Sequence, residues 1–281
     1  MRTVAEIRAA LAAPRRAGEL IGLVPTMGAL HDGHLSLVRR ARADCDVVVV
    51  SLFVNPAQFN ERSDLDSYPR DEGRDASLAE QAGADCLFAP PVEQVYPPGF
   101  ATTVSVAGVT EVLEGAHRGR AHFDGVTTIV AKLFNMVGPG VAYFGQKDAQ
   151  QTLVIKRMVR DLDMPVRIEV CPTVREPDGL AMSSRNLHLS GADRARAASL
   201  RRALAAVREA VAAGERDATA ARARGLTELT SAGVEPDYLE LVSTQTLDPV
   251  QRIADEVMAV VAARVGSARL IDNEIINDGR R

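Results

Sequence analysis

Lysine is almost absent from this sequence, since Lys132, Lys147 and Lys156 are the only three and arginine supplies the remaining basic charge. Acidic residues outnumber basic ones, 37 to 33, which gives a formal net charge of −4 at pH 7. A chain with this balance presents no broad basic surface, so we expect no nucleic-acid partner, although a local basic pocket is compatible with it.

Cysteines and long apolar runs are scarce as well. The three cysteines are odd in number and far apart, which predicts reduced thiols rather than a disulfide framework. No apolar run approaches the length needed to span a membrane, and residues 1–14 resemble an ordinary helix rather than a secretion signal. With 46% hydrophobic and 25% charged residues, the composition is typical of a globular protein. We therefore expect a soluble, cytoplasmic protein with no membrane partner.

Strand-like and helix-like segments alternate along the first part of the 281-residue chain. Val47–Val54 is apolar on both faces, as a central strand covered by helices on each side would be. The other expected strands are Ile21–Pro25, Asp85–Ala89, Val141–Phe144 and Val166–Val170, and the expected helices are Leu35–Ala43, Gly73–Ala82, Gly125–Val137 and Ala149–Asp161. The alternation predicts an α/β fold with a doubly wound parallel sheet, which binds ligands at the carboxyl ends of its strands.

The composition changes after a boundary expected near Thr173–Pro177. Gly191–Ala232 is rich in alanine and arginine and predicts two helices broken near Gly214. Three short strands are expected after them, at Tyr238–Val242, Val257–Val265 and Arg269–Ile271. We therefore expect two domains: residues 1–175, which carry the parallel sheet, and residues 176–281, a smaller α+β domain.

Met27–His34, with the sequence MGALHDGH, follows the first expected strand and leads into a helix-like stretch. Asp32 is a suitable N-cap, and a glycine-containing turn at a helix N-terminus offers backbone N–H groups and the positive end of the helix dipole to an anion. His31 and His34 could add donors to a phosphate. Two other interpretations stay open: a capped turn with solvent-facing histidines, and a metal pair that has no third ligand nearby.

Gly145-Gln146-Lys147-Asp148 follows the strand Val141–Phe144 and opens the next helix. Lys147 at a helix N-terminus suits a phosphate oxygen, and Asp148 could hold Mg²⁺ together with phosphate. Gln151, one turn later, would point to the same side of the helix. Taken alone, the segment would be interpreted as a surface Lys–Asp pair.

Two further segments carry polar side chains suited to anions. Asn55-Pro56-Ala57-Gln58-Phe59 follows the most buried strand, and its amides could bind a carboxylate or a hydroxyl, the alternative being a turn stabilised by Asn and Pro. Met182-Ser183-Ser184-Arg185-Asn186 offers two hydroxyls and a guanidinium for a closing phosphate clamp, the alternative being a serine-rich loop with an N-cap. For the basic stretch 114–123 the same two interpretations stay open, a phosphate-binding loop or a loop with a structural role only.

Neither a GxxxxGK[ST] phosphate loop nor a GxGxxG dinucleotide fingerprint occurs in the sequence. The second absence argues against a nicotinamide cofactor. Three anion-binding elements nevertheless fall on one α/β scaffold: the two histidines, Lys147 with Asp148, and Ser183–Arg185. Together they outline a nucleoside triphosphate site of a different type.

The order of a His-x-x-His motif and a later Ser-Ser-Arg loop resembles the nucleotidylyltransferase superfamily, with its HIGH and KMSKS-like signatures. The match extends to five motifs, which are PTMGALHDGH at 25–34, FVNPxQF at 53–59, YPR at 68–70, FGxKDxQQ at 144–151 and DGLAMSSRN at 178–186. In this order they resemble the pantoate–β-alanine ligase family over nearly the whole chain. The resemblance implies a Rossmann-like nucleotidylyltransferase fold, with ATP and pantoate bound by residues 1–175 and a lid formed by residues 176–281.

The resemblance also implies a two-step ligation of small-molecule substrates by a homodimer. The carboxylate of pantoate attacks the α-phosphate of ATP in the presence of Mg²⁺, which gives pantoyl adenylate and pyrophosphate. The amine of β-alanine then attacks the acyl carbon, which gives pantothenate and AMP. Such activation needs charge stabilisation at phosphorus and placement of two reactants more than it needs a protein nucleophile.

The family's motifs further imply roles for individual residues. The implied catalytic residues are His31, His34 (as a proton donor), Lys147, Ser183, Ser184 and Arg185. The implied ATP-binding residues are Met27, Gly28, Ala29, Leu30, His31, Asp32, Gly33, His34, Gly145, Gln146, Lys147, Asp148, Val174 (through its backbone), Met182, Ser183, Ser184 and Arg185. Pantoate or β-alanine would be bound by Gln58, Gln151 and Asn55, and Asp148 would face the metal.

Three features depart from the family's pattern. Ala57 stands where Met is usual, and Gln146 stands where Glu is usual. In the loop E-G-x-x-R-P-x-H-F, Gly119 replaces the proline and one residue is added before the histidine. Either Arg118 or Arg120 would therefore take that loop's role.

Two alternatives to a ligase stay open. One is a nucleotidylyltransferase that acts on another small substrate, and the other is a catalytically silent nucleotide-binding protein. The amides of Gln58 and Gln151 suit a small hydroxy acid rather than a phosphorylated alcohol, and the retained His34, Lys147 and Arg185 indicate catalysis.

Overall fold

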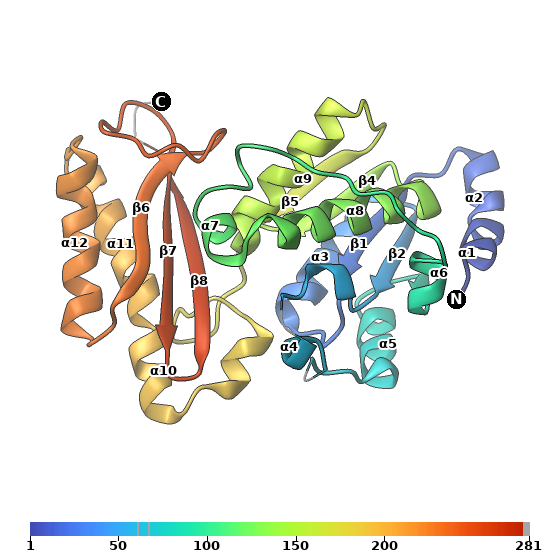
Figure 1. Ribbon diagram of the computed structural model, residues 1–281, viewed down its shortest axis with the longest axis horizontal. Coiled ribbons are helices and arrows are strands. Elements are labelled where there is room, and N and C mark those ends of the chain that lie inside the picture. The colour runs from blue at the N-terminus through green and yellow to red at the C-terminus, as the bar shows by residue number, and fades with distance from the viewer. Residues whose placement is uncertain (61, 67, 278–281) are drawn as a thin grey trace. The chain divides into compact units, whose positions relative to one another are not determined.

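The computed structural model describes residues 1–60, 62–66 and 68–277, which form two compact units (Figure 1). The first unit comprises Met1–Gln146 and Gln150–Pro172, and the second comprises Lys147–Ala149 and the chain from Thr173 onward. The sequence places the boundary between residues 175 and 176. In the structure the chain passes to the second unit after Pro172, and a short segment around Lys147 already groups with that unit.

A five-stranded parallel sheet forms the centre of the first unit, with the strand order β3-β2-β1-β4-β5. The strands are β1 (Ile21–Thr26), β2 (Val47–Leu52), β3 (Cys86–Phe88), β4 (Val141–Gly145) and β5 (Arg167–Cys171). The order runs outward from β1 in both directions, which confirms the predicted doubly wound sheet. The strand order reverses between β1 and β4, and sheets of this kind bind ligands beyond the carboxyl ends of the strands at this point.

Four helices of the first unit match the predicted ones: α3 (Asp32–Asp44), α5 (Glu72–Gln81), α8 (Arg120–Val137) and α9 (Ala149–Asp161). The shorter helical segments are α1 (Val4–Ala10), α2 (Ala12–Ala17), α4 (Arg62–Asp66), α6 (Val92–Val95), α7 (Glu114–Arg118) and the 3-10 turns η1 (Pro56–Gln58), η2 (Gln146–Asp148) and η3 (Ser184–His188). Of these, η3 and residues 147–148 of η2 belong to the second unit. In the part of the chain that the structure describes, no helix is both long and apolar enough to cross a membrane.

Both faces of the parallel sheet are buried at its central strands, β1 and β2. Val24 and Val50 belong to a core cluster that they share with Val38 of α3. Leu23 and Val49 directly precede Val24 and Val50 in the chain, so their side chains point to the opposite face of the sheet. Both are 0% exposed. The all-apolar sequence of β2 therefore reflects a strand covered on both sides, as its composition predicts.

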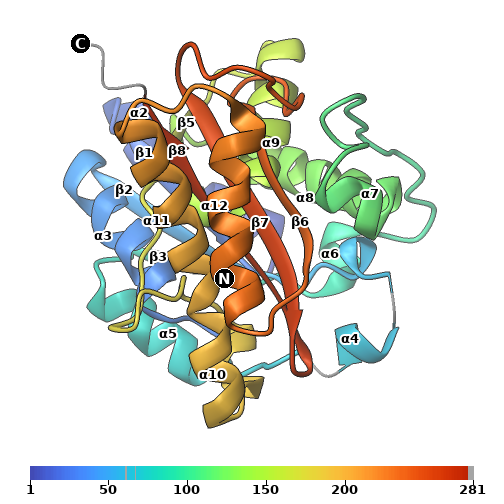
Figure 2. The ribbon, with the colours of Figure 1, turned by 90° about the vertical axis from the view of Figure 1, so that its left-hand side faces the viewer.

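The second unit contains a three-stranded antiparallel sheet, in the order β6 (Pro236–Ser243), β7 (Val257–Val265) and β8 (Ala268–Ile276). Helix α11 (Ser199–Ala212) packs on β7 and β8, and α12 (Ala218–Ser231) packs on β6 and on α11 (Figure 2). The α+β architecture predicted for this part of the chain is confirmed.

Two details of the second unit correct the sequence prediction. Three helices stand where two were expected, because α10 (Gly191–Ala197) ends at Ala198, which keeps helical angles (φ −60°, ψ −15°) and starts α11 without a glycine or proline signal. β8 also continues five residues beyond Ile271. Its polar residues Asp272 and Asn273 interrupt the apolar pattern, yet both are buried.

Candidate functional site

The turn between β1 and α3 carries both histidines of the predicted phosphate site. The N-cap of α3 is His31 and not Asp32, which corrects the expected cap. The Nδ1 atom of His31 accepts the N–H of Gly33 at 3.2 Å, and the Nδ1 atom of His34 accepts the N–H of His31 at 3.4 Å. The two rings lie 4.1 Å apart, centroid to centroid.

These two hydrogen bonds fix how the imidazoles are protonated. A ring nitrogen that accepts a backbone N–H carries no proton, so the neutral rings of His31 and His34 carry theirs on Nε2. Both side chains are half-buried. Each histidine therefore carries an Nε2–H donor on the side of the ring away from the helix cap.

The backbone of the same turn is held by a buried carboxylate that sequence reasoning missed. Asp75 of α5 is 1% exposed, and its two oxygens accept the N–H groups of Ala29 and Leu30, each at 2.8 Å. Ala29 has a positive φ of 52°, and Gly28 has a φ of 93°, so the chain turns sharply here. Asp75 stabilises a strained segment that leads directly into His31.

Four backbone N–H groups of the turn that was expected to bind an anion already have acceptors within the protein. The N–H groups of Ala29 and Leu30 are bound to Asp75, that of Gly33 to His31, and that of Gly28 to the Thr26 hydroxyl at 3.3 Å. A phosphate at this turn would therefore be met chiefly by the side chains of the two histidines.

Asn55 and Gln58, predicted to contact a carboxylic acid, lie next to the histidine turn. The Nε2 atom of Gln58 lies 3.0 Å from the Sδ atom of Met27, which brings 25–34 and 53–59 together. The carbonyl of Gln58 accepts a hydrogen bond from Nδ1 of His122 on α8, at 2.7 Å. Asn55 is 1% exposed, and its side chain forms hydrogen bonds with Ala57, Gln58, Tyr96 and Gly125.

The two neighbouring glutamines of α9 have different environments. Gln150 is buried, and its amide bonds with the backbone of Val109, Val112 and Glu114. Gln151, the predicted substrate ligand, is half-buried. Gln150 therefore stabilises the loop that precedes α7, and Gln151 remains the candidate for binding.

The loop of altered sequence before α8 places its two arginines differently. Arg118 donates from Nε to the buried carboxylate of Glu114 at 3.1 Å. The carbonyl of Arg118 also accepts a hydrogen bond from Asn60. Arg120 bonds with the hydroxyl of Ser105 at 3.0 Å and is more exposed than Arg118. Which of the two takes the loop's role stays a prediction.

In the second unit, Lys147 and Asp148 form a close pair at η2, with Nζ of the lysine 3.4 Å from Oδ1 of the aspartate. The lysine side chain is 18% exposed and that of Asp148 is 48% exposed. The carbonyl of Lys147 accepts a hydrogen bond from the buried amide of Asn273, at 3.0 Å. Asn273 on β8, which sequence reasoning missed, thus fixes the backbone that carries the lysine.

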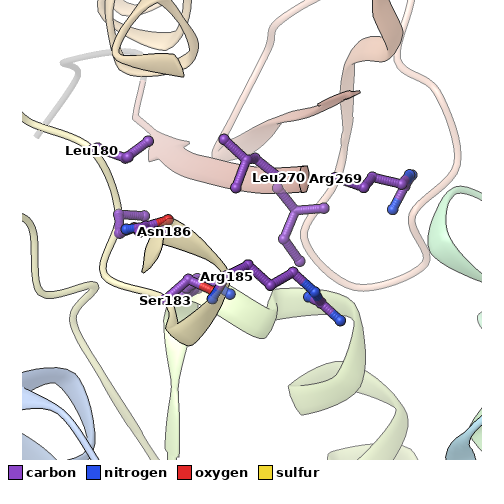
Figure 3. A pocket seen from close by; sticks show the side chains of 9 residues that line it. Leu180, Ser183, Arg185, Asn186, Arg269 and Leu270 are labelled. Atoms are coloured by element: carbon purple, nitrogen blue, oxygen red, sulfur yellow. The ribbon is translucent and has the colours of Figure 1, made fainter. Parts of the chain in front are cut away.

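Three of the predicted phosphate-binding residues line one small pocket of the second unit. Lys147, Ser183 and Arg185 share it with Asn186 and with Arg269 of β8. Figure 3 shows Ser183 and Arg185 on one side of this pocket and Leu270 with Arg269 on another. The structure therefore brings together cationic and hydroxyl groups from 144–151 and 178–186, as the motifs predicted for this half of the site.

The segment that carries Ser183 is anchored to β8. The N–H of Met182 bonds to the carbonyl of Val174 at 3.0 Å, so 174–182 folds back on itself. Arg175 forms two hydrogen bonds with the buried carboxylate of Asp272, at 2.6 and 3.0 Å. This bidentate ion pair is specific in its geometry, and it fixes the start of the predicted clamp.

A second ion-pair cluster supports the same segment. Arg194 of α10 donates to Glu176 and to Asp178, both at 2.5 Å, and Asn186 donates to Glu176 at 2.7 Å. The hydrogen bond from Arg194 holds the pKa of Asp178 below its usual value. Burial alone would raise the pKa of Glu176, but the hydrogen bonds from Arg194 and Asn186 outweigh it and lower that pKa.

We expect Arg194→Gln to lower the free energy of unfolding at pH 7 by about 1 kcal/mol, the upper end for partly exposed ion pairs. Folded-state pKa values that lie below the unfolded values, which are about 4, stabilise the fold above that pH and lose the contribution as the pH falls through them. Urea unfolding at pH 7 and at pH 3 measures the difference between wild type and variant. If the difference in unfolding free energy is equally large at pH 7 and at pH 3, the ion pairs of Arg194 are not its origin.

Comparison with known proteins connects both units to one family. The family model described as pantoate-beta-alanine ligase matches residues 1–275. A curated relative from Cereibacter sphaeroides, a pantothenate synthetase, is 55% identical over 274 residues, which are 97% of this chain and 98% of that protein. A pantothenate synthetase from Moorella thermoacetica is 53% identical over 277 residues and covers 98% of each chain.

Solved structures give the same result. The crystal structure of a pantothenate synthetase from Thermus thermophilus superposes with a TM-score of 0.92, at 51% identity over 98% of both chains. The ligase from Francisella tularensis, crystallised in complex with beta-gamma ATP and β-alanine, superposes with a TM-score of 0.80 at 32% identity, covering 100% of this chain and 98% of that one. The similarity thus extends over both units.

Proposed function

This chain belongs to the pantoate–β-alanine ligase family and is an ATP-dependent enzyme that joins pantoate to β-alanine, and we propose that it does so through a pantoyl adenylate. A carboxylate oxygen of pantoate forms a bond to the α-phosphorus of ATP while the bond to the β-phosphate oxygen breaks, so that pyrophosphate leaves. The amine of β-alanine then forms a C–N bond to the acyl carbon, loses a proton and expels AMP.

The pocket of Lys147, Ser183 and Arg185 is the observation that carries this proposal. Adenylation moves negative charge onto phosphate oxygens, and fixed cations and donors aimed at that charge are the main catalytic device available to a protein without a nucleophile. The related enzyme from Francisella tularensis was crystallised with beta-gamma ATP and β-alanine, which are the ligand types that the proposed reaction requires.

Each part of the site then has a proposed task. His31 and His34 contact the ATP phosphates through their Nε2–H groups, and His34 takes the proton-donor role by donating this hydrogen bond to the departing pyrophosphate. Met27, Gly28, Ala29, Leu30, Asp32, Gly33, Gly145, Gln146, Val174, Met182 and Ser184 shape the surface against which ATP binds. Gln58 and Gln151 orient pantoate, so that its carboxylate faces phosphorus.

Asp148 is the residue that we propose as a ligand of a divalent cation. Among the described residues no group of three or more His, Cys, Asp or Glu side chains could hold a metal ion. Mg²⁺ does not need such a group, because one or two carboxylates together with substrate phosphates and water satisfy it. We propose that Asp148 holds Mg²⁺, which would neutralise phosphate charge when bound.

The oligomeric state and the cellular location are also proposals. The resemblance to the family supports a homodimer that works in the cytoplasm on small-molecule substrates, without a nucleic-acid or membrane partner. Static light scattering of the purified protein tests the dimer, and a mass near 30.1 kDa would exclude it.

Omission of single substrates tests the proposed reaction. We expect AMP release only when ATP, pantoate and β-alanine are all present. We also expect exchange of labelled pyrophosphate into ATP that requires pantoate but not β-alanine, because the adenylate forms before the amine attacks. AMP formed equally without pantoate or without β-alanine would overturn the ligase assignment. Normal AMP release without pantoate-dependent exchange would overturn the adenylate, and stabilisation by ATP without turnover would indicate a silent nucleotide-binding protein.

A further inference from the structure

Asn55 uses its entire hydrogen-bonding capacity inside the protein. Its Oδ1 atom accepts the N–H of Ala57 at 3.3 Å and the hydroxyl of Tyr96 at 2.7 Å. Its Nδ2 atom donates to the carbonyl of Gly125 at 3.0 Å and to Oε1 of Gln58 at 3.1 Å. A side-chain amide has two donor hydrogens and two acceptor lone pairs, so the 1% exposed Asn55 has none left for a substrate.

Two backbone groups determine which way the Asn55 amide points. The N–H of Ala57 can only donate, so the atom that faces it is the oxygen, and the carbonyl of Gly125 can only accept, so the atom that faces it is the nitrogen. The remaining N–H of Asn55 then requires an acceptor on Gln58. Gln58 therefore turns Oε1 toward Asn55 and its Nε2 away from it.

The Tyr96 hydroxyl closes the network. Burial raises the pKa of Tyr96 to about 12, although its hydrogen bond to Asn55 acts in the opposite direction. The hydroxyl is therefore protonated at neutral pH and donates to Oδ1. Its ring packs against Phe53 and Phe100, with centroid distances of 6.2 and 5.2 Å, which holds the hydroxyl in place.

Among the residues that the structure describes, the outward-facing donor of Gln58 has only a weak acceptor. Its Nε2 atom lies 3.0 Å from the thioether sulfur of Met27, and a thioether sulfur is a poor acceptor. An oxygen of a bound carboxylic acid is a stronger hydrogen-bond acceptor than this sulfur, so it would replace the contact with Met27. The same amide turned over would present Oε1 and repel a carboxylate.

We propose that Asn55 and Tyr96 are positioning residues, which orient the Gln58 amide so that its Nε2–H donates to an oxygen of pantoate. The inference rests on the proposed function, because it takes pantoate as the ligand of Gln58. The motif predicts that Asn55 contacts the substrate itself. In this proposal Asn55 instead supports Gln58, and Gln58 makes that contact.

Tyr96→Phe tests the proposal, with Tyr143→Phe as the matched control. Tyr143 lies in the same unit, and its hydroxyl contacts Cys45 and Asp44, each at 3.2 Å, instead of any of the residues around Gln58. Loss of one neutral hydrogen bond costs about 1 kcal/mol of free energy, which corresponds to about a fivefold change in an equilibrium constant. We therefore expect Tyr96→Phe to raise the KM for pantoate about fivefold, with kcat and the KM for ATP within twofold of wild type, and Tyr143→Phe to change none of the three.

Asn55→Asp is the second variant, because it replaces the N–H group that selects Oε1 of Gln58 by an acceptor. We expect Gln58 to turn over and the KM for pantoate to rise at least tenfold. An unchanged KM for pantoate in a folded Tyr96→Phe enzyme, or an equal rise in Tyr143→Phe, would overturn the positioning role. Wild-type enzyme without pantoate-dependent AMP release would instead overturn the proposed function, so the two failures are distinguishable.

Discussion

Replacing Lys147 by alanine is expected to lower kcat for AMP release by about 10²–10³-fold, which is the usual cost of removing one preorganised donor from a developing oxyanion. The lysine side chain is 18% exposed and lines the pocket with Ser183 and Arg185. No other lysine of the sequence lies in the motifs of the site, since the remaining two are Lys132 and Lys156. After the substitution, the guanidinium groups of Arg185 and Arg269 are the cations left among the residues that line this pocket.

Lys156→Ala is the matched control for that variant. Lys156 lies exposed on α9, and we expect its removal to leave kcat within twofold of wild type. Thermal unfolding of both variants shows that they are folded. Turnover of Lys147→Ala within threefold of wild type would remove Lys147 from the catalytic residues. His34→Ala is harder to interpret, because the Nδ1 atom of His34 also completes the cap of α3. The substitution would therefore change both the stability of the fold and the rate of catalysis.

Periodicity and composition were sufficient to predict the sheet of the first unit. The five expected strands and four main helices are confirmed, because buried strands such as β2 have a continuous apolar sequence and the helices between them have apolar residues at helical spacing. The break at Ala198 was not predictable in this way. It occurs inside an alanine- and arginine-rich stretch without glycine or proline, where only tertiary packing decides that one helix ends and another begins.

The residues that support the candidate site were harder to predict than those proposed to contact the substrates. His31, Lys147 and Arg185 belong to local motifs, and their spacing carried the prediction. Asp75 and Asn273 act on segments 45 and 126 positions away in the chain. An aspartate in a polar helix or an asparagine near the chain end gives no local sign of such a partner. The one available signal is the polar pair Asp272-Asn273, which directly follows the apolar Leu270-Ile271 in the same strand.

Gly125→Ala is expected to have the second-largest effect, because α8 crosses directly over the segment that carries Gln58. An alanine Cβ at position 125 would lie 2.5 Å from the carbonyl carbon of Ala57 and 2.8 Å from the amide nitrogen of Gln58. Both are backbone atoms, so rotation of a side chain cannot relieve the contact. Overpacking of this kind typically costs about 1–3 kcal/mol, which exceeds the gain of about 1 kcal/mol that alanine brings to a helix.

The displacement would also break the hydrogen bond between the Gly125 carbonyl and Asn55, on which the orientation of Gln58 depends. We therefore expect Gly125→Ala to unfold at lower urea concentration and to raise the KM for pantoate at least tenfold. Gly73→Ala is the control: it is also a helical glycine of the first unit, but the nearest atom to its added Cβ is 3.9 Å away, so it should gain stability and keep its KM. If the two variants behave alike, the close approach of α8 does not shape the substrate site.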